Sequence, residues 1–175
     1  ILTKAVKKQS IIILLIFAVL FIMIKVNPAI GEPFNRITLV YLPYFVFIMY
    51  CINRSSSVTQ AMFMNCDHSM LTYRIYRTPK VILGIFKERL KTLITINLLP
   101  AILIGSGLAM LLYISGGTDN PMNYLIIIVS IIAMSIFFSV HYLVMYYLLQ
   151  PYNASTEMKS STYKVAQALT YLVVY

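Results

Sequence analysis

The sequence alternates between long apolar runs and short polar stretches, a pattern that predicts a bundle of membrane-spanning helices. A transmembrane helix needs about 20 predominantly apolar residues, and several runs reach or approach that length. Segments rich in proline, glycine and polar residues separate these runs, as turns do. We therefore expect an all-α, polytopic transmembrane helix bundle that forms a single domain over residues 1–175, with spans at about residues 11–30, 34–52, 92–114 and 122–149 and the start of a fifth at 163–175.

The apolar core of the first span is shorter than a membrane-spanning helix requires. Its uninterrupted apolar core covers residues 11–24, and Lys25 can extend it by reaching toward the far interface. Residues 1–10 are either an amphipathic segment on the membrane surface or simply a positively charged stretch that precedes the first span. We expect residues 27–33 to form a turn-rich loop.

Two spans contain proline, which removes a backbone donor and kinks a helix. Pro43 lies in the second span and Pro100 in the third. Both are hinge candidates, although a proline kink in a membrane helix can equally be static. Gly105 and Gly107 predict a thin helix face packed against a neighbour.

The long water-compatible run lies at residues 53–91, between the second and third spans. It holds half of the fourteen lysine and arginine residues. Thr78 is a fair N-cap and Pro79 suits a first helical turn, so we expect a helix that runs from Pro79 into the third span. Three lysines should form one face of this stem, and Arg89, near the apolar edge, should snorkel toward water.

The first part of this run, residues 60–77, predicts a helix with two apolar faces. At about 100° per residue, one stripe contains Met62, Phe63, Cys66, Met70 and Tyr73. A second patch contains Met64, Leu71 and Ile75. Two faces indicate contact with this chain and with a partner, or two contacts within this chain.

Composition places the chain among membrane proteins. It is 60% hydrophobic and 11% charged, whereas an average soluble domain is about 25% charged. Mean hydropathy is +0.83. Because the sequence starts at Ile1 and ends within an apolar run at Tyr175, we expect it to be a piece of a longer protein. We expect no signal peptide, because no small-residue cleavage site follows the first apolar run.

The net charge of +9 indicates orientation rather than nucleic-acid binding. With a cytosolic N-terminus and alternating spans, twelve of the fourteen basic residues face the cytosol, and only Lys25 and Arg36 lie outside. We therefore place residues 53–91 in the cytosol.

Catalytic and metal chemistry find little support, and we expect neither an enzyme nor a metal site. Ser106 and His141 differ in depth by roughly 9 Å at 1.5 Å per residue, too far for a nucleophile and its base. Ser106 should instead bond back to its own helix. Adjacent helical residues such as Cys66, Asp67 and His68 point in different directions and cannot share a metal ion.

His141 remains a functional candidate because it is ionisable and lies in a span. It either lines a substrate path or takes up a proton, or it lies near the inner interface or bonds to a neighbouring helix. The spans contain no acidic residue, which weakens the case for an ion-coupled secondary transporter.

The order of spans and the string NCDHSMLTYRIYRTP at residues 65–79 resemble the membrane subunit (permease) of an ABC-2-type bacterial ATP-binding-cassette exporter. The resemblance implies that the amphipathic helix between spans 2 and 3 is a cytosolic coupling helix that docks on an ATPase subunit. Its partner-binding surface would consist of Met64, Asn65, Asp67, His68, Leu71, Arg74, Ile75 and Arg77.

The same resemblance implies a location and partners. The chain would lie in the bacterial cell membrane, beside a second permease copy or a paralogue. It would carry no cofactor, because ATP and magnesium would bind to the ATPase subunit or to a missing domain. Two alternatives stay open: a non-transporting scaffold, sensor or immunity protein, and the ion-coupled secondary transporter.

Overall fold

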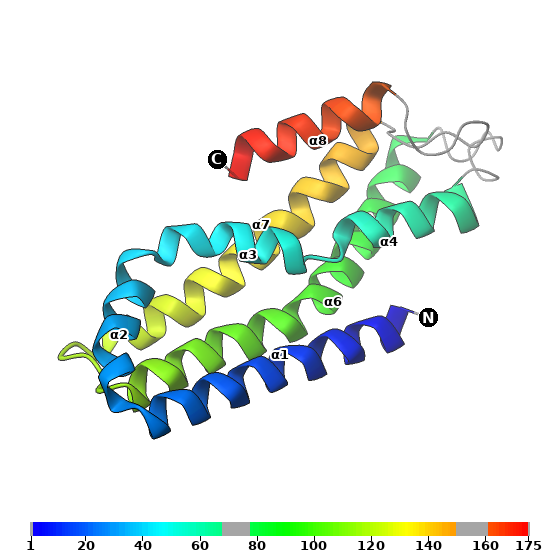
Figure 1. The fold of residues 1–175 in the computed structure, drawn as a ribbon. Helices are drawn as coiled ribbons and strands as arrows, with labels where there is room; N and C mark the ends of the chain where they lie inside the picture. Colours follow the sequence, from blue (N-terminus) through cyan, green and yellow to red (C-terminus); the bar gives the residue numbers. More distant parts are fainter. Residues whose placement is uncertain (1, 68–77, 150–160, 175) are drawn as a thin grey trace. The chain divides into compact units, whose positions relative to one another are not determined.

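The computed structural model describes residues 2–67, 78–149 and 161–174, and within these ranges the chain is helical and contains no strand. Figure 1 shows the helices in chain order. They are α1 (Leu2–Val26), α2 (Gly31–Val40), α3 (Phe45–Ile52), α4 (Ser55–Met62), α6 (Pro79–Ile114), α7 (Met122–Leu149) and α8 (Ser161–Val174), together with the 3₁₀ turns η1 (Pro28–Ile30) and η2 (Leu42–Tyr44) and the π-helical turn η3 (Phe63–Asp67).

Three described helices are long and apolar enough to cross a membrane: residues Lys4–Val26, α6 and α7. The segments Pro28–Val40 and Leu42–Asn65 pass the same test together, but they are bent by 71° at their junction. The described chain therefore has three spans, or four if the bent pair counts as one. These helices confirm the predicted all-α, membrane-spanning class.

The helices divide into two compact units. Unit 1 contains residues 1–52 and 98–136, and unit 2 contains residues 53–97 and 137–175. The long helices α6 and α7 contribute residues to both.

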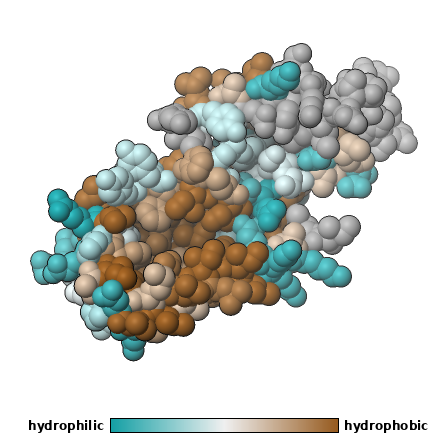
Figure 2. All heavy atoms as spheres, in the orientation of Figure 1, coloured by the Kyte–Doolittle hydropathy of each residue, from teal (hydrophilic) through white to brown (hydrophobic). Residues whose placement is uncertain are grey.

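Unit 1 packs α1, α2 and α3 with the last part of α6 and the first part of α7. Gly107 lies so close to α1 that an added Cβ would stand 2.8 Å from the Phe17 ring, and a Cβ on Gly105 would lie 3.3 Å from the Ile128 Cα. These contacts confirm the predicted thin face. The outward face of α1 is apolar (Figure 2), as a helix facing lipid requires.

The first connection differs from the predicted loop at residues 27–33. The span ends at Val26, and residues 28–40 are helical. Pro28 opens η1, and Pro33 lies in the first turn of α2. Proline is tolerated at such positions, because the backbone N–H that it lacks would have no partner within the helix. The prolines that suggested a loop therefore start helices here. Residues 1–10 do not form a separate segment, because α1 continues through them.

The second span is broken where Pro43 predicted a kink. Helix α2 ends at Val40, Pro43 lies in η2, and α3 begins at Phe45. Pro100, by contrast, lies inside the continuous helix α6 and is buried.

Unit 2 contains α4, η3, the first part of α6, the last part of α7, and α8. Leu93 and Leu143 are fully buried in its core, together with Phe138. This unit contains the described part of residues 53–91.

Candidate functional site

The segment α4–η3 is the described beginning of the arm, which we define as residues 53–91. One of its faces is buried: Ser55, Val58, Thr59 and Phe63 are at most 7% exposed. Met64, next to Phe63, is 59% exposed. The arm thus packs one face into unit 2 and leaves a methionine of the predicted second patch uncovered.

Three residues of the predicted partner-binding surface fall within the described chain. Met64 is exposed, the Asn65 amide donates a hydrogen bond to the Ala61 carbonyl at 2.7 Å, and Asp67 ends η3. The other five residues of that surface, His68, Leu71, Arg74, Ile75 and Arg77, lie outside the described residues. The predicted helix over residues 60–77 is therefore described only to Asp67, where its last turn is π-helical.

The stem of the arm, residues 79–91, is the first part of α6. The Thr78 carbonyl accepts hydrogen bonds from the Val81 and Ile82 backbone N–H groups at 3.1 and 3.2 Å, which starts the helix. The helix then runs without interruption into the third span, as predicted. The predicted lysine face is exposed at Lys80, Lys87 and Lys91.

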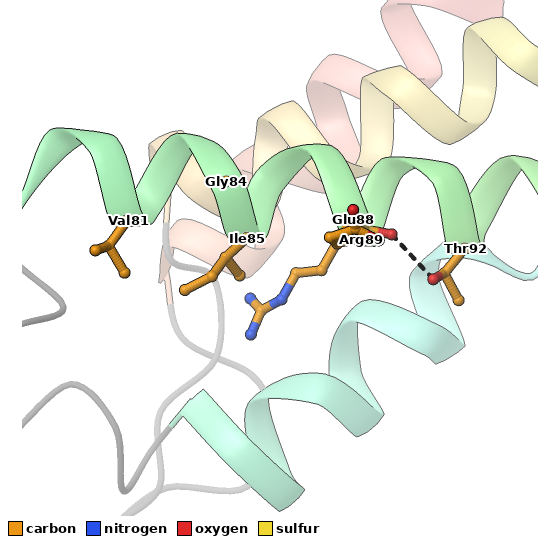
Figure 3. Close-up of a pocket in the computed structure, with 6 residues that line it drawn as sticks. All are labelled: Val81, Gly84, Ile85, Glu88, Arg89 and Thr92. Carbon is orange, nitrogen blue, oxygen red and sulfur yellow. Dashed lines mark hydrogen bonds between the residues drawn. The ribbon is translucent and has the colours of Figure 1, made fainter.

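An open depression of about 450 Å³ lies beside the stem, and its described lining comes from one side of α6 (Figure 3). Val81, Ile85 and Arg89 project from this side, and Gly84 leaves room between them. Glu88 and Thr92 complete the described lining.

Arg89 is held by an aromatic side chain of α7. Its Nη1 donates a hydrogen bond to the Tyr147 hydroxyl at 3.1 Å, and its guanidinium carbon lies 5.8 Å from the centre of that ring. Phe86 meets the same ring edge-on, with the ring centres 5.3 Å apart. A cation over an aromatic face is a favourable contact. The guanidinium predicted to snorkel toward water is instead partly buried against α7.

A buried polar cluster joins the start of the arm to both long helices. Asn97 of α6 is 2% exposed, and Ser55 of α4 and Ser139 of α7 are fully buried. The Asn97 amide donates to the Ser55 hydroxyl at 2.8 Å and to the Ser139 hydroxyl at 3.0 Å. Its oxygen accepts the Arg54 backbone N–H at 2.9 Å. We call Arg54, Ser55, Asn97 and Ser139 the Asn97 cluster.

The junction that precedes α4 is capped by side chains. A helix start leaves backbone N–H groups without intrahelical partners. The Asn53 side-chain oxygen accepts the Ser55 N–H at 2.9 Å, beside the bond from Arg54 to Asn97. The Asn53 amide nitrogen is buried without a hydrogen-bond partner among the described residues. The junction is therefore well fixed at its backbone but leaves one donor unsatisfied.

The preceding helix end is also capped, within unit 1. The Ile52 carbonyl, at the C-terminus of α3, accepts a hydrogen bond from the Gln9 amide of α1 at 2.7 Å. Helix ends leave carbonyls that need such partners.

His141 contacts the last helix of the described chain. Its Nε2 lies 3.0 Å from the hydroxyl of Thr170 in α8, and its ring stacks on Phe137 with centres 6.0 Å apart. Of the roles predicted for His141, the bond to a neighbouring helix is present. The Ser106 hydroxyl donates to the Ile102 carbonyl at 2.7 Å, as expected of a serine that bonds to its own helix.

Metal-ligating side chains do not gather in the described ranges. Among residues 2–67, 78–149 and 161–174, no group of three His, Cys, Asp or Glu residues could hold an ion.

Asn97 was not among the functional residues predicted from the sequence. One signal was available, because a lone asparagine in an apolar span needs hydrogen-bond partners. Its partners, Ser55 and Ser139, each lie 42 residues away in sequence, so no local pattern could identify them.

No protein-family model matches the chain, and comparisons with curated proteins and with solved structures found no match. Its function therefore has to be argued from the arm, the Asn97 cluster and the spans themselves.

Proposed function

We propose that the chain is a membrane-spanning subunit of an ATP-binding-cassette exporter. The observation that carries this proposal is the two-sided arm. It begins with a buried face on Ser55, Val58 and Phe63, exposes Met64, and returns to the membrane through the continuous helix α6. An element that is fixed to its own bundle and also offers a methionine to a partner suits the transmission of movement.

In this proposal the subunit performs no chemistry. An ATPase subunit binds ATP and magnesium, and its closure moves the arm, which switches the packing of the spans. A second copy of the permease, or a paralogue, completes the pathway in the bilayer. The excess of basic residues on one side supports a cytosolic N-terminus in a bacterial cell membrane.

Within this proposal Asp67, Arg74 and Arg77 supply charge to the docking surface. Pro43, at the break between α2 and α3, is the better pivot candidate, because α6 stays continuous through Pro100. His141 stands beside the substrate path only if its bond to Thr170 opens during transport.

The proposal is tested by purifying the full-length protein with its ATPase. Charge reversal by Asp67→Lys, Arg74→Glu and Arg77→Glu should abolish ATPase association and transport. The matched control is Lys87→Glu, which reverses an exposed charge on the stem and should leave association unchanged.

Three results would contradict the proposal. Unchanged association and transport after the triple reversal would exclude a coupling role for the arm. A protein that never associates with an ATPase would be a scaffold, sensor or immunity protein. Transport that persists without ATP but collapses with an ion gradient would indicate a secondary transporter.

A further inference from the structure

Asn97 contacts the start of the arm, at Arg54 and Ser55, rather than its exposed part near Met64. Three hydrogen bonds join Asn97 to Arg54 and Ser55, the residues where α4 begins, and to Ser139 in α7. Asn97 itself belongs to α6. One amide group therefore connects the beginning of the arm to two long apolar helices.

The chemistry of the cluster differs from that of the packing around it. Apolar contacts have no preferred direction, whereas hydrogen bonds lose most of their strength beyond a narrow range of distance and angle. The three bonds measure 2.8 to 3.0 Å. The two bonds to the serine hydroxyls are buried in low-dielectric surroundings, where an unmade bond is costly, and the bond from Arg54 is partly buried. Movement of the α4 start should therefore carry α6 and α7 with it.

We propose that Asn97 is a positioning residue that transmits movement of the beginning of the arm, at the start of α4, to the membrane-spanning parts of α6 and α7. The proposal rests on the proposed function, because it needs a partner that moves the arm. It assigns the transmission step to a residue outside the predicted docking surface of residues 64–77. Loss of Asn97 should therefore separate two events that the intact protein couples: docking of the ATPase and rearrangement of the spans.

The experiment uses the full-length protein in complex with its ATPase, in a background where both cysteines, Cys51 and Cys66, are replaced by serine. Two spin-label pairs report on different events. Labels at Met64 and Lys87, both exposed, report movement of the arm. Labels at Val26 and Tyr113, which are 78% and 73% exposed, report movement in unit 1. Distances are measured by pulsed electron paramagnetic resonance with and without MgATP and vanadate.

In the parent protein we expect MgATP with vanadate to shift both distances. In Asn97→Leu the arm distance should still shift, and the Val26–Tyr113 shift should be lost. The control Thr59→Val removes a buried hydroxyl from α4 that bonds within its own helix, to the Ser56 carbonyl at 2.9 Å. It should preserve both shifts, which separates transmission from a general loss of stability.

A second variant keeps the proposal testable if Asn97→Leu does not fold. Ser139→Ala removes the hydroxyl through which Asn97 bonds to α7 and should reduce the Val26–Tyr113 shift. Ser135→Ala, which removes another buried hydroxyl of α7, should leave it unchanged.

The outcomes are distinct. If both shifts survive in Asn97→Leu or in Ser139→Ala, transmission through Asn97 is wrong and the exporter function stands. If the parent protein binds no ATPase or shows no shift in either pair, the proposed function fails and the transmission role falls with it.

Discussion

Two asparagines, one in each unit, make similar numbers of polar contacts but fix different kinds of structure. In unit 1, Asn35 of α2 donates to the Ser115 and Gly117 carbonyls, both at 3.1 Å, and also contacts the Ser115 hydroxyl. In unit 2, Asn97 contacts the start of α4 and the middle of α7. The first asparagine closes a turn, whereas the second joins three separate helices.

Their settings explain the difference. The turn that Asn35 contacts ends α6 with a Schellman-type cap, in which the Gly117 N–H bonds to the Leu112 carbonyl at 3.0 Å. Gly116 and Gly117 have φ angles of +114° and +72°, which glycine adopts without strain. This turn is held by its own backbone as well as by Asn35. The start of α4 depends more on side chains, so we expect Asn97 to matter more than Asn35.

The largest expected effect is that of Asn97→Ala. It leaves Arg54 and Ser55 at the start of α4, and Ser139 in α7, without these bonds. We expect the free energy of unfolding to fall by about 3 kcal/mol. Reversible unfolding in mixed detergent micelles measures the change. Thr95→Ala, which alters an exposed residue of the same helix, should change the free energy by less than about 0.5 kcal/mol. Equal effects of the two variants would contradict a special role for the cluster.

Gly31→Ala tests the tightest backbone contact of unit 1. An added Cβ would lie 2.9 Å from the Ser115 carbonyl oxygen and 3.3 Å from its Cα, where no flexible side chain can yield. We expect a loss of about 2 kcal/mol, typical of overpacking. The matched variant is Gly84→Ala, because nothing lies within 4 Å of a Cβ there. It should stabilise α6 by up to about 1 kcal/mol through helix propensity.

Asn35→Ala should cost about 1 kcal/mol, because it releases the carbonyl of buried Ser115 and that of Gly117, which is partly exposed and can bond to water instead. The measurement is the same unfolding experiment. A cost as large as that of Asn97→Ala would show that the two clusters do not differ in the way we infer.

Asn53→Ala should have the smallest effect. It removes the cap on the Ser55 N–H, which costs about 1 kcal/mol, and also removes a buried donor that has no partner among the described residues. The two effects oppose each other, so the net change in unfolding free energy should stay below about 0.5 kcal/mol. A loss near that of Asn97→Ala would show that Asn53 belongs to the same cluster.

Long apolar runs made the spans predictable. Helix α7 covers Met122–Leu149, as predicted, because an uninterrupted apolar run follows the polar turn at residues 115–121. The start of α6 at Pro79 was predicted from its cap. The helical start of the second segment at Pro28 was not, because proline opens helices as readily as it ends them.

The arm was harder to predict from sequence. Ser55 and Thr59 suggested a water-compatible stretch, yet they are at most 2% exposed. Their burial is tolerable because Ser55 bonds to Asn97 and Thr59 bonds to its own helix. Such compensation depends on residues distant in sequence, which periodicity does not reveal.

Helix α6 is longer than a membrane span requires. Its 36 residues make a rod of about 54 Å at 1.5 Å per residue, whereas the hydrocarbon core measures about 30 Å. About 16 residues must therefore extend beyond the hydrocarbon if the rod stands upright. The last exposed lysine, Lys91, is the thirteenth residue of the helix, close to where this arithmetic puts the surface. Asn97 lies about two turns further along the helix. If Asn97 has the proposed positioning role, movement outside the membrane would therefore act on α6 just inside the hydrocarbon.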